Sequence, residues 1–130
     1  MIYRALGNTG LQVSEIGLGC EGFTEQEGMG TYALVDAAAD AGINYFDLYS
    51  PDPNLRLHLG KALAGRRDQF IIQAHLCSVW KDGQYKRTRI LEEVQAGFED
   101  LLHQLHTDHV EIGMIHYVDS LKDWQAVAEG

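Results

Sequence analysis

Three side chains capable of acid–base chemistry end short apolar runs of the chain. Asp47 ends INYFD, His75 ends QFIIQAH, and His116 ends HVEIGMIH. A carboxylate beside a histidine favours the charged form of the imidazole, so an acid with two histidines could carry out general acid–base catalysis. The same three residues, with Glu21 as a further oxygen donor, could instead bind a divalent metal ion, since two histidines and one carboxylate are a common ligand set.

The elements that must position these residues alternate between two kinds of segment. A repeated strand–helix order predicts parallel strands with helices outside them, and functional groups of such folds gather beyond the carboxyl ends of the strands. Side-chain alternation places Asp47, His75 and His116 on the shared face of their strands. Apolar runs predict strands at 15–20, 43–47, 69–75 and 109–116, helical spacing predicts helices at 31–41, 55–64 and 88–105, and the turn GNTG between 3–6 and 11–13 predicts a β-hairpin.

Two architectures fit this order: a small open α/β sheet, or part of a closed (β/α)8 barrel of the TIM type. A complete barrel needs about 250 residues, and the chain has 130. We therefore expect a single partial barrel domain over 1–130, with an N-terminal hairpin at 1–13 and four strand–helix units over 14–130. The open strand edges would be exposed, so they would be covered by the rest of a longer protein or by a second copy in a homodimer.

Composition excludes several classes of function. The net charge of -9 argues against nucleic-acid binding and against adhesion to an anionic membrane surface. No apolar run approaches the length of a membrane span, and the first ten residues lack the apolar core of a signal peptide. The two cysteines, Cys20 and Cys77, form no C-x-x-C motif, which favours a reducing, cytoplasmic location over a disulfide framework.

Four stretches of the chain resemble, in order and spacing, the N-terminal half of the aldo-keto reductases: GNTGLQVSEIGLGCEGF, DAGINYFDLY, LGKALAGRRDQFIIQAH and HVEIGMIHYVD. The resemblance implies a (β/α)8 barrel whose floor is closed by the N-terminal hairpin. It also implies reduction of a small aldehyde or ketone with a nicotinamide cofactor, NADPH or NADH. The segments YSPDPNLR and CSVWKDGQYKR resemble a divergent bacterial branch, some members of which carry a C-terminal iron–sulfur module.

The family uses an aspartate, a tyrosine, a lysine and a histidine for catalysis, and the chain matches two of them. Asp47 matches the aspartate and His116 the histidine. His75 stands where the family has its lysine, and Asp52 stands where it has its tyrosine. Tyr49 is the nearest substitute for that tyrosine, and His75 could itself donate the proton while Asp47 stabilises the imidazolium.

The resemblance also implies where the cofactor would lie. Gly19, Cys20 and Glu21, together with Asp47, occupy the place where the family's first loop approaches the nicotinamide. Most adenosine and phosphate contacts of the family come from the second half of the barrel, so we expect weak cofactor binding by these residues alone. A half-barrel that lacks the family's tyrosine and lysine could alternatively be a non-catalytic scaffold that self-associates.

Overall fold

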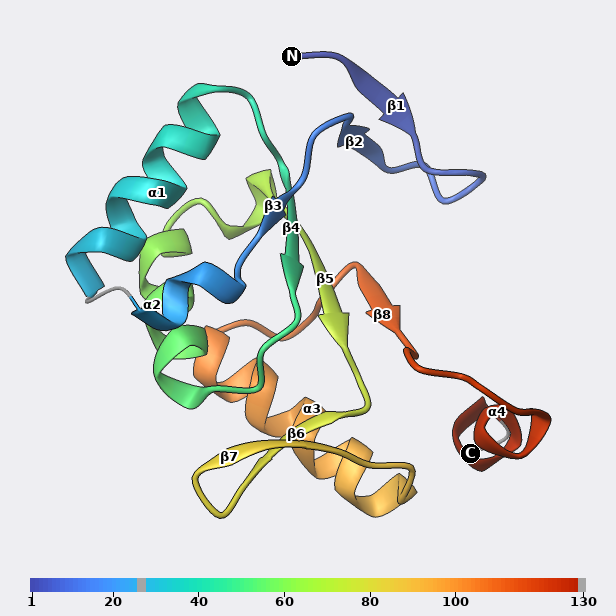
Figure 1. The fold of residues 1–130 in the computed structure, drawn as a ribbon. Helices are drawn as coiled ribbons and strands as arrows, with labels where there is room; N and C mark the ends of the chain where they lie inside the picture. The colour runs from blue at the N-terminus through green and yellow to red at the C-terminus, as the bar shows by residue number, and fades with distance from the viewer. Residues whose placement is uncertain (26–27, 129–130) are drawn as a thin grey trace.

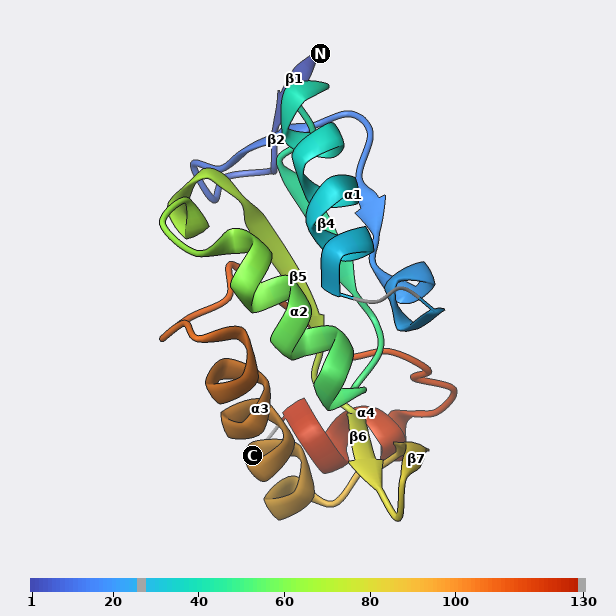
Figure 2. The same ribbon diagram turned by 90° about the vertical axis from the view of Figure 1, so that its left-hand side faces the viewer.

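A four-stranded parallel sheet forms the centre of the protein, in a computed structural model that describes residues 1–25 and 28–128. Its strand order follows the chain, β3-β4-β5-β8, as expected for the wall of an α/β barrel. The helices that join the strands lie on one side of the sheet (Figures 1 and 2). These elements are β3 (Leu18–Gly19), α1 (Gly28–Asp40), β4 (Tyr45–Leu48), α2 (Pro53–Leu63), β5 (Ile71–His75), α3 (Leu91–Leu105) and β8 (Ile112–Met114).

The core lies between the sheet and the three helices. All five residues of β5 are buried, because this strand has a neighbour on each side and helices over one face. Gly60 allows α2 and α3 to approach closely, since a Cβ at this position would lie 2.6 Å from the carbonyl oxygen of Leu105. The largest apolar side chains that are fully buried in this core are Phe46, Leu48, Leu55, Leu59, Leu63, Ile72 and Leu101.

The N-terminal hairpin lies at the amino end of the sheet (Figure 1). Its strands, β1 (Tyr3–Ala5) and β2 (Gln12–Ser14), pair antiparallel, as the sequence predicts. Asn44, directly before β4, ties the hairpin to the sheet. Its side-chain oxygen accepts a hydrogen bond from the Ser14 N–H at 2.8 Å, and its side-chain amide donates to the Gln12 carbonyl at 2.9 Å.

A second hairpin follows β5 and was not predicted. The segment between β5 and α3, for which no strand was predicted, contains β6 (Ser78–Lys81) and β7 (Gln84–Arg87), which pair antiparallel. Asp82 and Gly83 join them with φ angles of 55° and 75°, the conformation of a type I′ turn. An Asp-Gly pair between two runs that contain aromatic residues was the sequence signal for this hairpin.

All four predicted strands are shorter in the structure, and the reason is visible for β8. β8 pairs only with Gln73–His75 of β5, because the preceding N–H of β5, that of Ile72, donates to the side chain of Glu111 at 2.7 Å instead of to a backbone carbonyl. β8 ends at Met114, so His116 lies beyond the strand. The last helix, α4 (Leu121–Ala128), has no buried residue and lies apart from the other helices (Figure 1).

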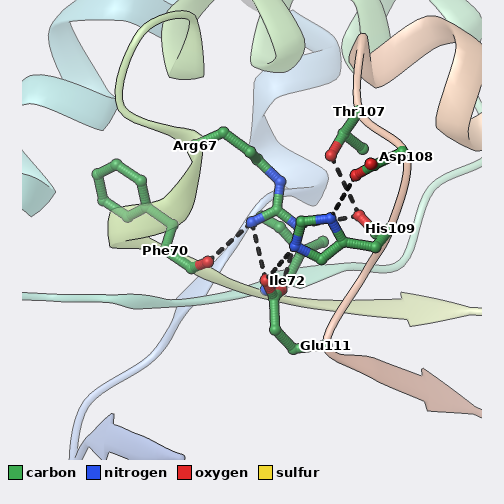
Figure 3. Close-up of polar contacts among 7 residues, drawn as sticks. All are labelled: Arg67, Phe70, Ile72, Thr107, Asp108, His109 and Glu111. Atoms are coloured by element: carbon green, nitrogen blue, oxygen red, sulfur yellow. Dashed lines mark hydrogen bonds and ion pairs between the residues drawn. The ribbon is translucent and has the colours of Figure 1, made fainter.

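Glu111 joins the amino ends of β5 and β8 (Figure 3). Both of its carboxylate oxygens accept hydrogen bonds from Arg67 at 3.1 Å. Arg67 also donates to the carbonyls of Phe70 and His109, at 2.8 and 3.0 Å. Burial raises the pKa of Glu111, but the hydrogen bonds from Arg67 and the Ile72 N–H outweigh it and hold the pKa below its usual value. The ionised carboxylate therefore stabilises the fold above about pH 4.5, and this contribution is lost as the pH falls.

We predict that Glu111→Gln lowers the free energy of unfolding by about 2 kcal/mol, the usual scale for hydrogen bonds to a charged group. A neutral amide offers one acceptor atom in place of the two carboxylate oxygens, and it turns a donor toward Arg67 or Ile72. Chemical denaturation at neutral pH measures the loss. Glu99→Gln, the same change at an exposed position of α3, is the control. Equal stability of the two variants would show that the Glu111 contacts do not stabilise the sheet.

Candidate active site

Asp47 and His75 meet at the carboxyl end of the sheet. In the parallel register of β4 and β5, Asp47 lies beside Gln73, and His75 follows two residues later on the same face. The His75 Nε2 atom is 2.8 Å from Oδ1 of Asp47. The ring of His75 is buried, whereas 37% of the Asp47 side chain is exposed. The structure therefore brings together two of the residues predicted to form a site, with the carboxylate as the more accessible group.

Gln73 and Tyr45 extend this contact and were not among the predicted site residues. The side-chain amide of Gln73 donates to the same Oδ1 atom of Asp47 at 2.8 Å. The Tyr45 hydroxyl in turn donates to the Gln73 side-chain oxygen at 2.6 Å. Both residues share the face of Asp47 and His75 by strand alternation, so this alternation was the signal that could have found them.

His116 lies beside the pair, beyond the end of β8. Its ring centroid is 4.9 Å from that of His75, and its Nε2 atom is 3.4 Å from the Ser78 hydroxyl. Burial, together with the charges of His75 and Arg89, lowers the pKa of His116 to about 4. The imidazole of His116 is therefore neutral near pH 7, where it can donate one hydrogen bond and accept another but carries no charge.

Tyr49 packs over both histidines. Its ring lies edge-on to His75 at a centroid distance of 5.2 Å and 6.0 Å from the ring of His116. It stacks on Tyr85 of β7 at 5.6 Å. Hydrogen bonding with the hydroxyls of Tyr85 and Tyr117 raises the pKa of Tyr49 above its usual value. Tyr49 thus reaches the site, but as a phenol that holds its proton more firmly.

Asp52, which stands where the family tyrosine is expected, caps a helix. Its Oδ1 atom accepts hydrogen bonds from the N–H groups of Asn54 and Leu55 at 2.8 and 3.2 Å, in the first turn of α2. Pro53 begins that helix, a position that proline favours. The interactions of Asp52 are therefore those of an N-cap residue.

Gly19, Cys20 and Glu21 lie on the other side of Asp47. Gly19 pairs with Asp47 in the sheet, and the Cys20 N–H donates to the Asp47 carbonyl at 2.9 Å. The Cys20 thiol is fully buried, and burial followed by the charge of Asp47 raises its pKa to about 12, so it is no thiolate nucleophile. Glu21 is exposed at the start of the short helix η1 (Glu21–Glu25).

The alternative of a metal site at Asp47, His75 and His116 finds no support. Within residues 1–25 and 28–128, no group of three or more His, Cys, Asp or Glu side chains is arranged to hold a metal ion. In the observed arrangement, Oδ1 of Asp47 accepts from Gln73 and contacts the Nε2 atom of His75. Over the same described residues, no helix is long and apolar enough to cross a membrane.

Comparison with known proteins identifies the class to which this barrel wall and its site belong. The sequence profile of the aldo/keto reductase family matches residues 15–129. The chain therefore belongs to the aldo/keto reductase family, whose members use NAD(P)H.

Individual relatives agree with this assignment. Aldo-keto reductase YhdN of Bacillus subtilis is 32% identical over 99% of this chain and 42% of its own length. Among solved structures, the aldo-keto reductase PA4992 of Pseudomonas aeruginosa superimposes with a TM-score of 0.85 at 29% identity, over 97% of this chain and 51% of its own. The holo form of aldo-keto reductase AKR11C1 from Bacillus halodurans gives a TM-score of 0.83 at 25% identity, covering 99% and 46%.

The chain thus spans about two fifths of the length of the curated relatives it matches. It spans about half of the length of these two solved structures. Its fold is accordingly a partial α/β barrel of the TIM type, as the sequence predicts.

We predict that the His116 imidazole titrates with a midpoint near pH 4 in the folded protein and near 6.5 in urea. The unfolded chain then binds more protons than the folded one between these two values, so His116 makes the fold less stable as the pH drops from 6.5 to 4. NMR of the imidazole protons measures the midpoint. Arg87→Gln should raise it, because the charge of Arg87 is one cause of the shift, whereas Lys61→Gln on α2 should not. A midpoint above pH 6 would contradict the burial of this ring.

Proposed function

We propose that this chain contributes the nicotinamide-proximal strands of an NAD(P)H-dependent oxidoreductase that reduces a small aldehyde or ketone. One observation carries the proposal: the 2.8 Å contact between Asp47 and His75 at the carboxyl ends of β4 and β5. In the family these two positions hold the aspartate and the lysine. An imidazolium beside a carboxylate can supply the positive charge that an ammonium would supply, so the pairing supports retention of the site.

Each residue has a proposed role in the reduction. A bound nicotinamide would supply the hydride that the carbonyl carbon requires. The His75 imidazolium supplies the proton that the carbonyl oxygen requires and becomes a neutral imidazole, and Asp47 stabilises its charged form before the transfer. His116, neutral because its pKa lies at about 4, donates a hydrogen bond that orients the carbonyl oxygen. The raised pKa of Tyr49 makes it a poor proton donor. Its proposed role is instead to pack against both histidine rings and exclude water from them.

The residues before Asp47 fit the nicotinamide end of the cofactor. A Cβ added to Gly19 would meet no atom within 4 Å, so the backbone at this position borders open space. Asp47 and Glu21 offer carboxylate oxygens, which suit a carboxamide or ribose hydroxyls and repel phosphates. The proposed contacts of Gly19, Cys20, Glu21 and Asp47 are therefore with the nicotinamide nucleoside, and binding by these residues alone should be weak for NADPH and NADH alike.

We further propose a cellular location and an oligomeric state for the protein. The two cysteines are free and buried, which supports a reducing, cytoplasmic location.

Four large apolar side chains beyond β8 are exposed: Tyr117, Val118, Leu121 and Trp124. This apolar surface beside the open edge of β8 supports self-association through that edge as a homodimer. Static light scattering during size-exclusion chromatography distinguishes the monomeric and dimeric masses.

A matched pair of variants tests the proposed chemistry. Asp47→Asn should lower kcat/KM at least about 100-fold, the usual contribution of a general acid–base group. Asp52→Asn makes the same change five residues away. It should leave kcat/KM within a few-fold, because asparagine caps a helix about as well as aspartate. NADPH and NADH oxidation with a panel of small aldehydes and ketones, on the polypeptide as its gene encodes it, provides the measurement.

Equal activities of the two variants would contradict the role of Asp47. Absence of turnover in the wild type, with every carbonyl and both nucleotides, would contradict reductase function itself. Thermal unfolding of both variants must accompany the kinetics, so that a loss of folded protein is not read as a loss of chemistry.

A further inference from the structure

The Asp47 carboxylate is held by two neighbours on β5. Its Oδ1 atom accepts from the Gln73 amide and contacts His75 Nε2, both at 2.8 Å. Within the described ranges 1–25 and 28–128, no hydrogen bond reaches the other oxygen, Oδ2. Gln73 and His75 are buried, but 37% of the Asp47 side chain is exposed. Oδ1 of Asp47 thus makes contacts within the protein, and Oδ2 is available on the exposed side of the carboxylate.

Tyr45 fixes the orientation of the Gln73 amide. Its hydroxyl donates to the Gln73 side-chain oxygen at 2.6 Å, so the NH2 group must point the other way, toward Asp47. Burial, followed by the charge of Asp47, raises the pKa of Tyr45. The phenol therefore keeps its proton and remains a hydrogen-bond donor near neutral pH. Gln73 is buried, with 9% of the residue exposed. Without the Tyr45 hydroxyl, the Gln73 side-chain oxygen would lose its hydrogen-bond partner, and the free-energy cost of this loss would favour reorientation of the amide.

We infer that Gln73 and Tyr45 are positioning residues for the Asp47–His75 pair: Tyr45 anchors the Gln73 amide, which holds Oδ1 of Asp47 on His75 and leaves Oδ2 for the bound reactants. The inference rests on the proposed function for its catalytic consequence. Its structural part stands on the three hydrogen bonds alone. Strand register explains why the four residues can act together. Tyr45 and Asp47 alternate on β4, Gln73 and His75 alternate on β5, and Asp47 lies directly beside Gln73.

Tyr45→Phe tests this inference, with Tyr3→Phe as the matched control. Each substitution removes one phenol hydroxyl and one hydrogen bond, because Tyr3 donates to the Gly42 carbonyl at 2.8 Å at the opposite end of the sheet. In the wild type, the two Gln73 side-chain amide protons should be well separated by NMR, because one is bonded to a carboxylate. Tyr45→Phe should move both signals toward those of a free glutamine, and Tyr3→Phe should leave them unchanged.

Kinetics supply the second readout, on the polypeptide as its gene encodes it. Tyr45→Phe and Gln73→Leu should each lower kcat about tenfold with KM within about twofold, because a misplaced carboxylate slows chemistry more than it weakens binding. Tyr3→Phe should change neither constant.

The outcomes separate the inference from the proposed function. Gln73 signals that move in Tyr45→Phe, in a protein that reduces no carbonyl, would support the anchoring and reject the reductase. Gln73 signals that stay unchanged in Tyr45→Phe would overturn the inference, whatever the kinetics. Moved signals with unchanged kcat in an active enzyme would also overturn it, because Asp47 would then need no positioning.

Discussion

The parallel register of β4 and β5 is the constraint on which the site depends. Asp47 lies beside Gln73, so His75 reaches the same carboxylate from two residues further on. A slip of one residue would turn these side chains toward the helices and bury a charge in the core. At the other end of the sheet, the Ile71 N–H donates to the Asn44 carbonyl at 2.7 Å and joins β5 to β4, while Glu111 joins β5 to β8 through Arg67 and the Ile72 N–H. The contacts that stabilise the sheet and the residues proposed for the chemistry therefore lie at opposite ends of the same strands.

The two departures from the family pattern have different physical consequences. At position 75 a histidine keeps the contact with Asp47 that a cation would make, but an imidazole loses its charge within the ordinary pH range, whereas an ammonium does not. At position 52 an aspartate caps α2, so the phenol of the family has no equivalent at that place in the chain. Tyr49 brings a phenol near the pair, yet its hydroxyl interacts with Tyr85 and Tyr117. The proposed chemistry therefore depends on the Asp47–His75 pair more than on a tyrosine.

Sequence reasoning predicted the strand–helix order, the first hairpin and the meeting of Asp47 with His75, because period-two alternation and parallel strand ends determine them. It missed the second hairpin, although its Asp-Gly turn was visible, and with it Tyr85. The orientation of Tyr49 depends on that hairpin and could not be read from spacing. The low pKa of His116 arises from burial and from charges distant in sequence, which only the folded chain brings together.

NADPH titration followed by NMR tests the proposed nicotinamide site beside Asp47, with 2′,5′-ADP as a probe that carries the adenosine phosphates but no nicotinamide. We predict that NADPH shifts the amide signals of Gly19, Cys20, Glu21 and Asp47 and the ring signals of His75, while 2′,5′-ADP leaves them in place. Such a result would locate the nicotinamide at the carboxyl ends of β3 and β4. Equal shifts with both compounds, or NADPH shifts confined to other parts of the chain, would contradict a nicotinamide site beside the Asp47–His75 pair.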